Sequence, residues 1–278
     1  MKLPIPCSPS WPVLACLLAS CVGSGPALPP PAPHANGQVL WEIVHGQCVP
    51  GQLSRGDPAP CAVVSMPDGA ARGYAILKDR NGVAQYLLMP TAKIAGIEDP
   101  AILQPGATNY FAKAWDDRGL IEKRLGRPLP RTRISIAVNS AYGRTQDQLH
   151  LHMDCVDLSV GAALQAAAIP RTGRWASHVV PLHGHPYRVR WLKADALEAA
   201  NPFTLLAGEM PGARRAMGAW TIALIGATGD DGAPGFYILA DRVDLAAHDD
   251  ASSEELQDHA CKPERGEAAA PDSQGRGP

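Results

Sequence analysis

The chain has no surplus of positive charge, no long apolar run and no closely spaced pair of cysteines beyond its N-terminal region. Its 25 Lys and Arg are matched by 27 Asp and Glu, whereas binding to nucleic-acid phosphates needs a basic surplus. The apolar stretch over residues 11–20 is too short for a permanent membrane-spanning helix. Zinc sites need cysteines at short spacing, so a zinc site is disfavoured as well.

Phenylalanine is also scarce, with only three in the chain, yet 46% of the 278 residues are hydrophobic. That proportion is enough for a sizeable core in one large domain or two small ones. Gly and Pro number 27 each, and because both interrupt helices, helix boundaries are hard to place from the sequence.

The first 20 residues have the pattern of a targeting signal. Leu18-Ala19-Ser20-Cys21 resembles the lipobox of bacterial lipoproteins, which would make Cys21 the site of lipid attachment. An ordinary secretory signal is the alternative, and an uncleaved anchor is disfavoured by the prolines at its start. All three predict export, and a lipid on Cys21 would hold the protein at the periplasmic face of a bacterial membrane, since each buried methylene contributes about 0.8 kcal/mol.

Four cysteines remain after the signal and Cys21 are set aside, an even number in an oxidising compartment. They are Cys48, Cys61, Cys155 and Cys261. Two disulfides are expected, and the sequence leaves three connectivities open. Cys48 with Cys61 is preferred because both lie in one early Pro/Gly-rich region, and Cys155 with Cys261 would then join a central strand to the C-terminus. Buried free thiols are the alternative.

Four parts follow from composition: a lipoprotein signal peptide over residues 1–20, a Pro-rich tether over 21–38, one folded domain over 39–261 and a disordered tail over 262–278. Within the domain, Asn81-Gly82 predicts a hairpin turn. A helix over 109–126 and strands over 133–140 and 149–156 come next, and a strand over 187–192, a helical segment and a hairpin over 220–242 follow. Short loops between strands predict an antiparallel α+β fold, in which the late elements form a second lobe or extend the same sheet.

The stretch L-H-L-H-M-D places His150, His152 and Asp154 on one face of a strand and the leucines and Met153 on the other. If the apolar face packs against a helix, the histidine face is left open to a cleft. Two imidazoles on one face can bind a metal, support nucleophilic attack on phosphorus or simply be two partly exposed histidines.

Surrounding residues favour the second of these chemistries. Val138-Asn139, Gln146, His150 and His152 are similar to the motif of the histidine triad (HIT) superfamily, His-φ-His-φ-His preceded by Gln and Asn. Further blocks, among them NSAYGRTQDQLHLHMDC, NPF..LAGEMP and SSEELQDHAC, resemble the CDP-diacylglycerol pyrophosphatase family from about residue 40 to 261. The resemblance implies an antiparallel HIT-like sheet with flanking helices and a C-terminal α+β extension.

The chain departs from the superfamily at the third motif position, where Asp154 replaces His. The spacing from Asn139 and Gln146 favours the frame His150, His152, Asp154, in which His152 is the nucleophile. A second frame, Gln148, His150, His152, makes His150 the nucleophile instead.

The resemblance implies hydrolysis of membrane-borne CDP-diacylglycerol to cytidine monophosphate and phosphatidate through a cytidylyl-histidine intermediate. This reaction requires no cofactor or metal, although a divalent cation could help to neutralise the pyrophosphate. Asp154 would steer His150 or handle the leaving-group proton. The candidates for binding the substrate are Asn139, Gln146, Arg144, Lys78 and His185.

Two other functions remain open at this point. One is a HIT-like nucleotidyl hydrolase or transferase that acts on other nucleotide diphosphate compounds. The other is a lipoprotein that binds a ligand or metal without catalysis. The sequence does not give the oligomeric state.

Overall fold

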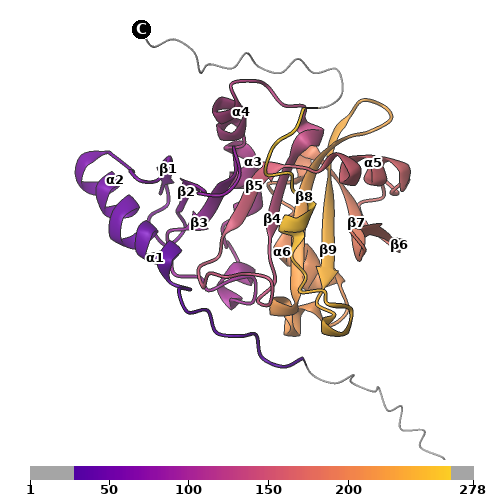
Figure 1. Ribbon diagram of the computed structural model, residues 1–278, viewed down its shortest axis with the longest axis horizontal. Helices are drawn as coiled ribbons and strands as arrows, with labels where there is room; N and C mark the ends of the chain where they lie inside the picture. Colours follow the sequence, from indigo (N-terminus) through magenta and orange to yellow (C-terminus); the bar gives the residue numbers. More distant parts are fainter. Residues whose placement is uncertain (1–27, 264–278) are drawn as a thin grey trace, which may run out of the picture. The chain divides into compact units, whose positions relative to one another are not determined.

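The computed structural model describes residues 28–263 and is built around one nine-stranded antiparallel sheet with the order β1-β2-β3-β5-β4-β8-β9-β7-β6 (Figure 1). The expected signal peptide, Cys21 and residues 264–278 of the expected tail lie outside the described residues. All strands belong to one unit that begins at Ala32. The strands are β1 Val63–Ser65, β2 Tyr74–Lys78, β3 Tyr86–Pro90, β4 Ile134–Val138, β5 Leu151–Cys155, β6 Trp175–Leu182, β7 His185–Lys193, β8 Trp220–Thr228 and β9 Pro234–Arg242.

The antiparallel α+β architecture predicted from the sequence is confirmed. The β2–β3 hairpin turns at Asn81-Gly82, where Gly82 has a φ of +65°, a left-handed conformation that such tight turns require. The late strands extend the same sheet and form no second lobe, because β8 pairs with β4 along residues 222–225.

The helices are α1 Val39–Ile43, α2 Val49–Arg55, α3 Tyr110–Asp116, α4 Gly119–Leu125, α5 Leu158–Ala166 and α6 Pro202–Glu209, with one π-helical turn between α1 and α2. The single helix expected over 109–126 is therefore two helices. The break follows Asp116, where the Arg118 guanidinium donates a hydrogen bond to the Trp115 carbonyl oxygen, 2.7 Å away. No helix within residues 28–263 has the length and apolar character needed to cross a membrane.

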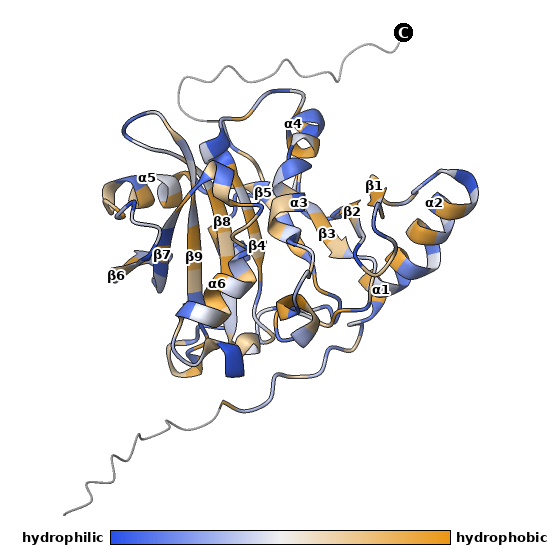
Figure 2. Ribbon diagram, turned by 180° about the vertical axis from the view of Figure 1, so that it is seen from behind, coloured by the Kyte–Doolittle hydropathy of each residue, from blue (hydrophilic) through white to orange (hydrophobic). Residues whose placement is uncertain are grey.

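The two faces of the sheet have different covers. Met153 of β5 is paired with Ile136 and Tyr86, and this face packs against α3 and α6, which Figure 2 shows in front of the sheet. Phe111 of α3 meets Phe203 of α6 with ring centroids 5.1 Å apart. The apolar side of β5 therefore meets helices, as expected from its alternating residues.

The face that carries His152 is covered only at its ends. Leu87 and Ala137 flank His152 on the neighbouring strands. Beyond them, α1 and α2 pack on β2 and β3, and α5 packs on the strands at the far end (Figure 1). The middle of this face, over β5 and β4, is left to a cleft and to a segment near the end of the described residues.

That segment, Asp249–Cys261, is called the C-terminal strap here. Its backbone is fastened at several points along the sheet: the Ser140 amide donates to Ala251 O at 3.0 Å, and the Asp258 amide donates to Cys155 O at 2.9 Å. The Gln257 side chain also donates to the carbonyl oxygen of His152, 2.9 Å away. The strap therefore lies directly beside the histidine strand.

Two disulfides join Cys48 to Cys61 and Cys155 to Cys261, which confirms the preferred pairing. The first bridge holds the end of the π-helical turn against the segment before β1. The second joins the last residue of β5 to the last residue of the strap, across a sequence separation of 106 residues. Because the second bridge closes the longer loop, it restricts the unfolded chain more strongly.

We expect Cys155→Ala/Cys261→Ala to lower the free energy of unfolding by about 5 kcal/mol and Cys48→Ala/Cys61→Ala by about 3 kcal/mol, from the entropy of closing each loop. Urea unfolding of both double variants and of the wild type, all under non-reducing conditions, measures the difference. Equal losses in the two variants would contradict a stabilisation set by loop length.

Candidate active site

His150 and His152 lie side by side at the start of β5, with ring centroids 4.9 Å apart and an angle of 64° between the ring planes. Both line a cleft of about 410 Å³, a volume within the range of small-molecule sites. One wall is apolar and comes from α1 and the first hairpin: Val39, Leu40, Ile43, Leu77 and Leu87. The polar side comprises Lys78, Asp79, Arg80, Asn81, Gln146 and Glu254 together with the two histidines.

His150 is held as a neutral imidazole. Its Nδ1 lies 2.6 Å from the backbone carbonyl oxygen of Gln148; a carbonyl oxygen only accepts, so Nδ1 carries the proton and Nε2 keeps its lone pair. Burial, aided by the neighbouring His152, lowers the pKa of His150 to about 3. Within residues 28–263, its Nε2 makes no hydrogen bond, so this nitrogen is available to a ligand in the cleft.

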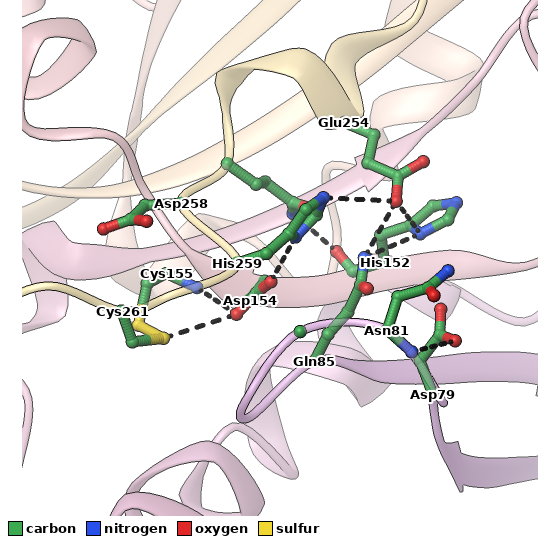
Figure 3. A network of polar contacts seen from close by, with 12 residues as sticks. Asp79, Asn81, Gln85, His152, Asp154, Cys155, Glu254, Asp258, His259 and Cys261 are labelled. Carbon is green, nitrogen blue, oxygen red and sulfur yellow. Dashed lines mark hydrogen bonds and ion pairs between the residues drawn. A yellow bond between two sulfur atoms is a disulfide. The ribbon is translucent and has the colours of Figure 1, made fainter.

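His152 has the opposite environment, because its Nδ1 lies 3.1 Å from the Glu254 carboxylate and 3.1 Å from the Gln85 amide (Figure 3). Burial alone would raise the pKa of Glu254, but hydrogen bonds from His152, Gln85 and Asn139 outweigh it and hold that pKa well below its ordinary value. The Glu254 carboxylate is therefore ionised, and it lies against the Nδ1 edge of His152. Nε2 of His152 is buried and has no hydrogen-bond partner among the described residues.

A second carboxylate–histidine pair lies behind the first. His259 Nδ1 is 2.7 Å from Asp154, and its Nε2 is 3.7 Å from Glu254 (Figure 3). The hydrogen bond that His259 donates to Asp154 raises the pKa of His259. Burial raises the pKa of Asp154, although this same hydrogen bond acts against it. Asp154 is fully buried and points to the strap, away from the cleft lining, so its direct partner is His259.

Asn139 and Gln146, expected to donate to phosphate, are engaged with the protein. Asn139 Nδ2 donates to Glu254 at 3.2 Å, and its side-chain oxygen accepts from the Glu254 amide at 3.2 Å. Gln146 donates to Asn36 O at 3.0 Å and accepts from the Leu40 amide at 3.2 Å. The first residue therefore holds the strap and the second holds the start of α1, although Gln146 still lines the cleft.

The three basic residues expected to contact the substrate lie in different surroundings. Lys78 lines the cleft and also caps the hairpin turn by donating to the carbonyl oxygens of Asp79, Asn81 and Gly82. Arg144 is nearly buried and forms a bidentate pair with Glu98, at 2.6 Å for each hydrogen bond. His185 bonds to Glu255 at 2.9 Å and does not line the cleft.

Sequence reasoning missed four residues of this arrangement: Gln85, Glu254, His259 and Arg80. Two of them, Glu254 and His259, lie in the SSEELQDHAC block, whose resemblance to the family was the one signal that could have found them. The expected bridge from Cys155 to Cys261 would also have placed that block beside the histidine strand. Arg80 is exposed on the cleft rim and forms no ion pair within the described part of the chain.

Comparisons with known proteins agree with the blocks along the chain. The sequence model of one family, described as CDP-diacylglycerol pyrophosphatase, matches residues 35–265. A Yersinia pestis protein named CDP-diacylglycerol pyrophosphatase is 44% identical over 228 residues, which cover 82% of this chain and 85% of that protein. The family match includes both cleft histidines, the strap and all four disulfide cysteines.

The buried neutral state of His150 predicts an acid-dependent loss of stability. The unfolded chain takes up a proton at this histidine near pH 6.5, and the folded protein only near pH 3. Below pH 6.5 the unfolded state therefore binds more protons, so the contribution of His150 is complete above that pH and is lost toward pH 3. From pH 6.5 to 5 the wild type should lose about 2 kcal/mol more than His150→Gln.

Urea unfolding of both proteins at the two pH values measures that difference in slope, independently of the absolute stability of the variant. His178→Gln is the matched control, because His178 is exposed on β6. The same pH dependence in wild type and His150→Gln would show that His150 does not stay neutral in the folded state.

Proposed function

The chain belongs to the CDP-diacylglycerol pyrophosphatase family, and from that membership we propose that its cleft hydrolyses the pyrophosphate bond of CDP-diacylglycerol through a cytidylyl-histidine intermediate. The products are cytidine monophosphate and phosphatidate. One observation carries the covalent step: a neutral imidazole, His150, with its Nδ1 proton held by a backbone carbonyl and its Nε2 unengaged in the cleft. An imidazole in that state is a nucleophile.

The contacts favour His150 as the nucleophile, which is the second of the two frames read from the sequence. The nucleophilic ring needs a proton acceptor for its other nitrogen, and the Gln148 carbonyl supplies this to His150. His152, the residue favoured by spacing, has a carboxylate and an amide at its Nδ1 instead. A ring beside an ionised carboxylate is better suited to carrying a proton, so His152 is assigned the role of acid and base.

In the first step, Nε2 of His150 bonds to the α-phosphorus and the bond from this phosphorus to the bridging oxygen breaks. Phosphatidate leaves with the electron pair and takes a proton from His152. The positive charge on the cytidylylated ring is stabilised by the hydrogen bond from Nδ1 to Gln148. In the second step, water attacks the phosphorus, one of its protons returns to His152, and the N–P bond breaks to release cytidine monophosphate.

Glu254, His259 and Asp154 act through His152 in this proposal. Glu254 orients the imidazole of His152 and stabilises its charged form. The aspartate of a Ser-His-Asp triad does the same for its histidine. His259 links Glu254 to the buried Asp154. Asp154 would thus affect the leaving-group proton through two intervening side chains, and Asn139 would act by holding Glu254.

The pyrophosphate would meet two cations on the hairpin rim, Lys78 and Arg80. Arginine and lysine stabilise the charge that develops on phosphoryl oxygens in the transition state. Arg144 would act from behind His150, because its guanidinium is already paired with Glu98. Gln146 would shape the cleft by holding α1.

Export and a lipid on Cys21 also remain a proposal, which fits the substrate. A diacylglycerol pyrophosphate stays in its bilayer, so a tethered enzyme would meet it at the interface. The apolar wall of the cleft begins at Val39, which is 43% exposed, at the end of the Pro-rich tether. That position is suited to receive the part of the substrate nearest to the acyl chains.

We expect His150→Asn to abolish the covalent adduct and lower kcat at least 10³-fold, because the variant lacks the proposed nucleophile and His152 is assigned to proton transfer. His152→Asn should still form the adduct, but slowly. CDP-diacylglycerol labelled in the cytidine, followed by a rapid quench and peptide mass spectrometry, locates the adduct. His178→Asn is the control. An adduct on His152 would reverse the assignment, and turnover of His150→Asn near the wild-type rate would refute it.

Glu254→Gln tests the proton path separately from binding. The amide has the same shape but no charge, so we expect kcat to fall roughly 10²-fold while KM changes little. The dependence of kcat on pH should differ from that of the wild type, because the variant lacks the ionised carboxylate that contacts His152. Steady-state kinetics from pH 5 to 9 measures both effects. If KM rises and the pH profile is unchanged, Glu254 has only a structural role.

A further inference from the structure

A second cluster of titratable side chains lies outside the cleft lining, where the strap begins. It joins His185 at the start of β7, Asp241 near the end of β9 and Asp249, the first residue of the strap. One ligand atom from each lies within 4.8 Å of the other two. None of the three lines the cleft, so the proposed hydrolysis does not use them.

The carboxylate of Asp241 is buried, and one of its two oxygens lacks a donor among the described residues. The side chain is 4% exposed, and its Oδ1 accepts from the Arg242 amide at 2.7 Å. Its Oδ2 has no hydrogen-bond donor among the described residues and belongs to the carboxylate that faces Asp249. Asp249 is 2% exposed and accepts from the Ala251 amide at 2.8 Å. Two buried carboxylates this close need a proton or a cation between them.

His185 does not fully supply the positive charge that Asp241 and Asp249 need. His185 Nδ1 lies 3.8 Å from Asp249 but only 2.9 Å from Glu255, which also accepts from the Tyr187 hydroxyl at 2.7 Å. No lysine or arginine pairs with any of these carboxylates in residues 28–263. Three carboxylates therefore surround one imidazole, and the excess of negative charge favours a divalent ion.

We propose that His185, Asp241 and Asp249 bind a divalent transition-metal ion that fastens the strap to the sheet. Imidazole nitrogen combined with carboxylate oxygen suits Mn²⁺ or Zn²⁺ better than Mg²⁺ or Ca²⁺, which prefer oxygen ligands alone. The alternative occupant is a proton shared by the two aspartates, in keeping with burial and Asp249 together raising the pKa of Asp241 to about 7.

An ion at this position would hold the strap, and with it Glu254, against the sheet. Asp249 exchanges two backbone hydrogen bonds with Asp244, at 2.9 and 3.0 Å, so it is already fixed to the turn after β9. The strap continues from there to Glu254, which contacts His152. An ion bound to β7, β9 and Asp249 would join these two neighbouring strands to the segment that carries Glu254.

Cation binding to the untagged full-length protein tests this proposal without measuring activity. After removal of metal with a chelator, titration with Mn²⁺ or Zn²⁺ by calorimetry should give one site per chain. Asp241→Asn and Asp249→Asn should each weaken binding at least 30-fold, since each removes one ligand charge. Asp230→Asn is the control, because this aspartate is fully exposed in the β8–β9 turn.

A double variant, His150→Gln/His152→Gln, separates this site from the cleft. Retained binding in that variant supports the site at Asp241, and lost binding would move the ion to the cleft histidines and overturn the proposal. The absence of stoichiometric binding to the wild type would also overturn it and would leave the shared proton as the occupant. All of these experiments measure metal binding and none measures activity. A failure of the metal proposal can therefore be distinguished from a failure of the proposed hydrolysis.

Discussion

The proposed chemistry depends on one contact between distant parts of the chain, the carboxylate of Glu254 against the imidazole of His152. Burial opposes the charge on Glu254, and three donors compensate for it: His152, Gln85 and Asn139. These donors come from β5, from the first hairpin and from the residue after β4. The ionised carboxylate therefore stabilises the strap and the histidine strand in one arrangement, because removing any donor leaves a charge that is harder to bury.

This contact also separates the chemistry of two neighbouring imidazoles. Burial keeps His150 neutral and the Gln148 carbonyl oxygen holds its proton on Nδ1, whereas the Nδ1 of His152 lies 3.1 Å from the ionised Glu254 carboxylate. Two neighbouring imidazoles with such different partners are suited to different roles, one as nucleophile and one in proton transfer. Alternation along β5 brings the rings to one face, and the difference between them comes from partners outside the strand.

The sequence predicted what depends on short-range patterns. Period-two alternation predicted the histidine face and its apolar opposite, and Asn81-Gly82 predicted the hairpin. The even number of cysteines predicted two disulfides, and the early Pro/Gly-rich region favoured the pairing observed. It did not predict the partner of each side chain. Asn139 and Gln146 have the spacing of phosphate donors, yet their amides are used by Glu254 and by α1, which lie more than 100 residues away in sequence. Spacing reports which residues share a face, whereas hydrogen-bond partners depend on segments that only the fold brings together.

The same reasoning explains why the cleft needs both ends of the domain. Its apolar wall comes from α1, near the start, and from the first hairpin, and Glu254 comes from the strap, near the end. The central strand between them supplies the histidines. Gln146 holds α1 through its amide, and the Cys155–Cys261 bridge holds the strap. Both anchors flank β5 in sequence, one just before the histidines and one just after them. Residues just before and at the end of β5 thus hold the two walls of the cleft, and Gln85 and Asn139 add further contacts to the strap.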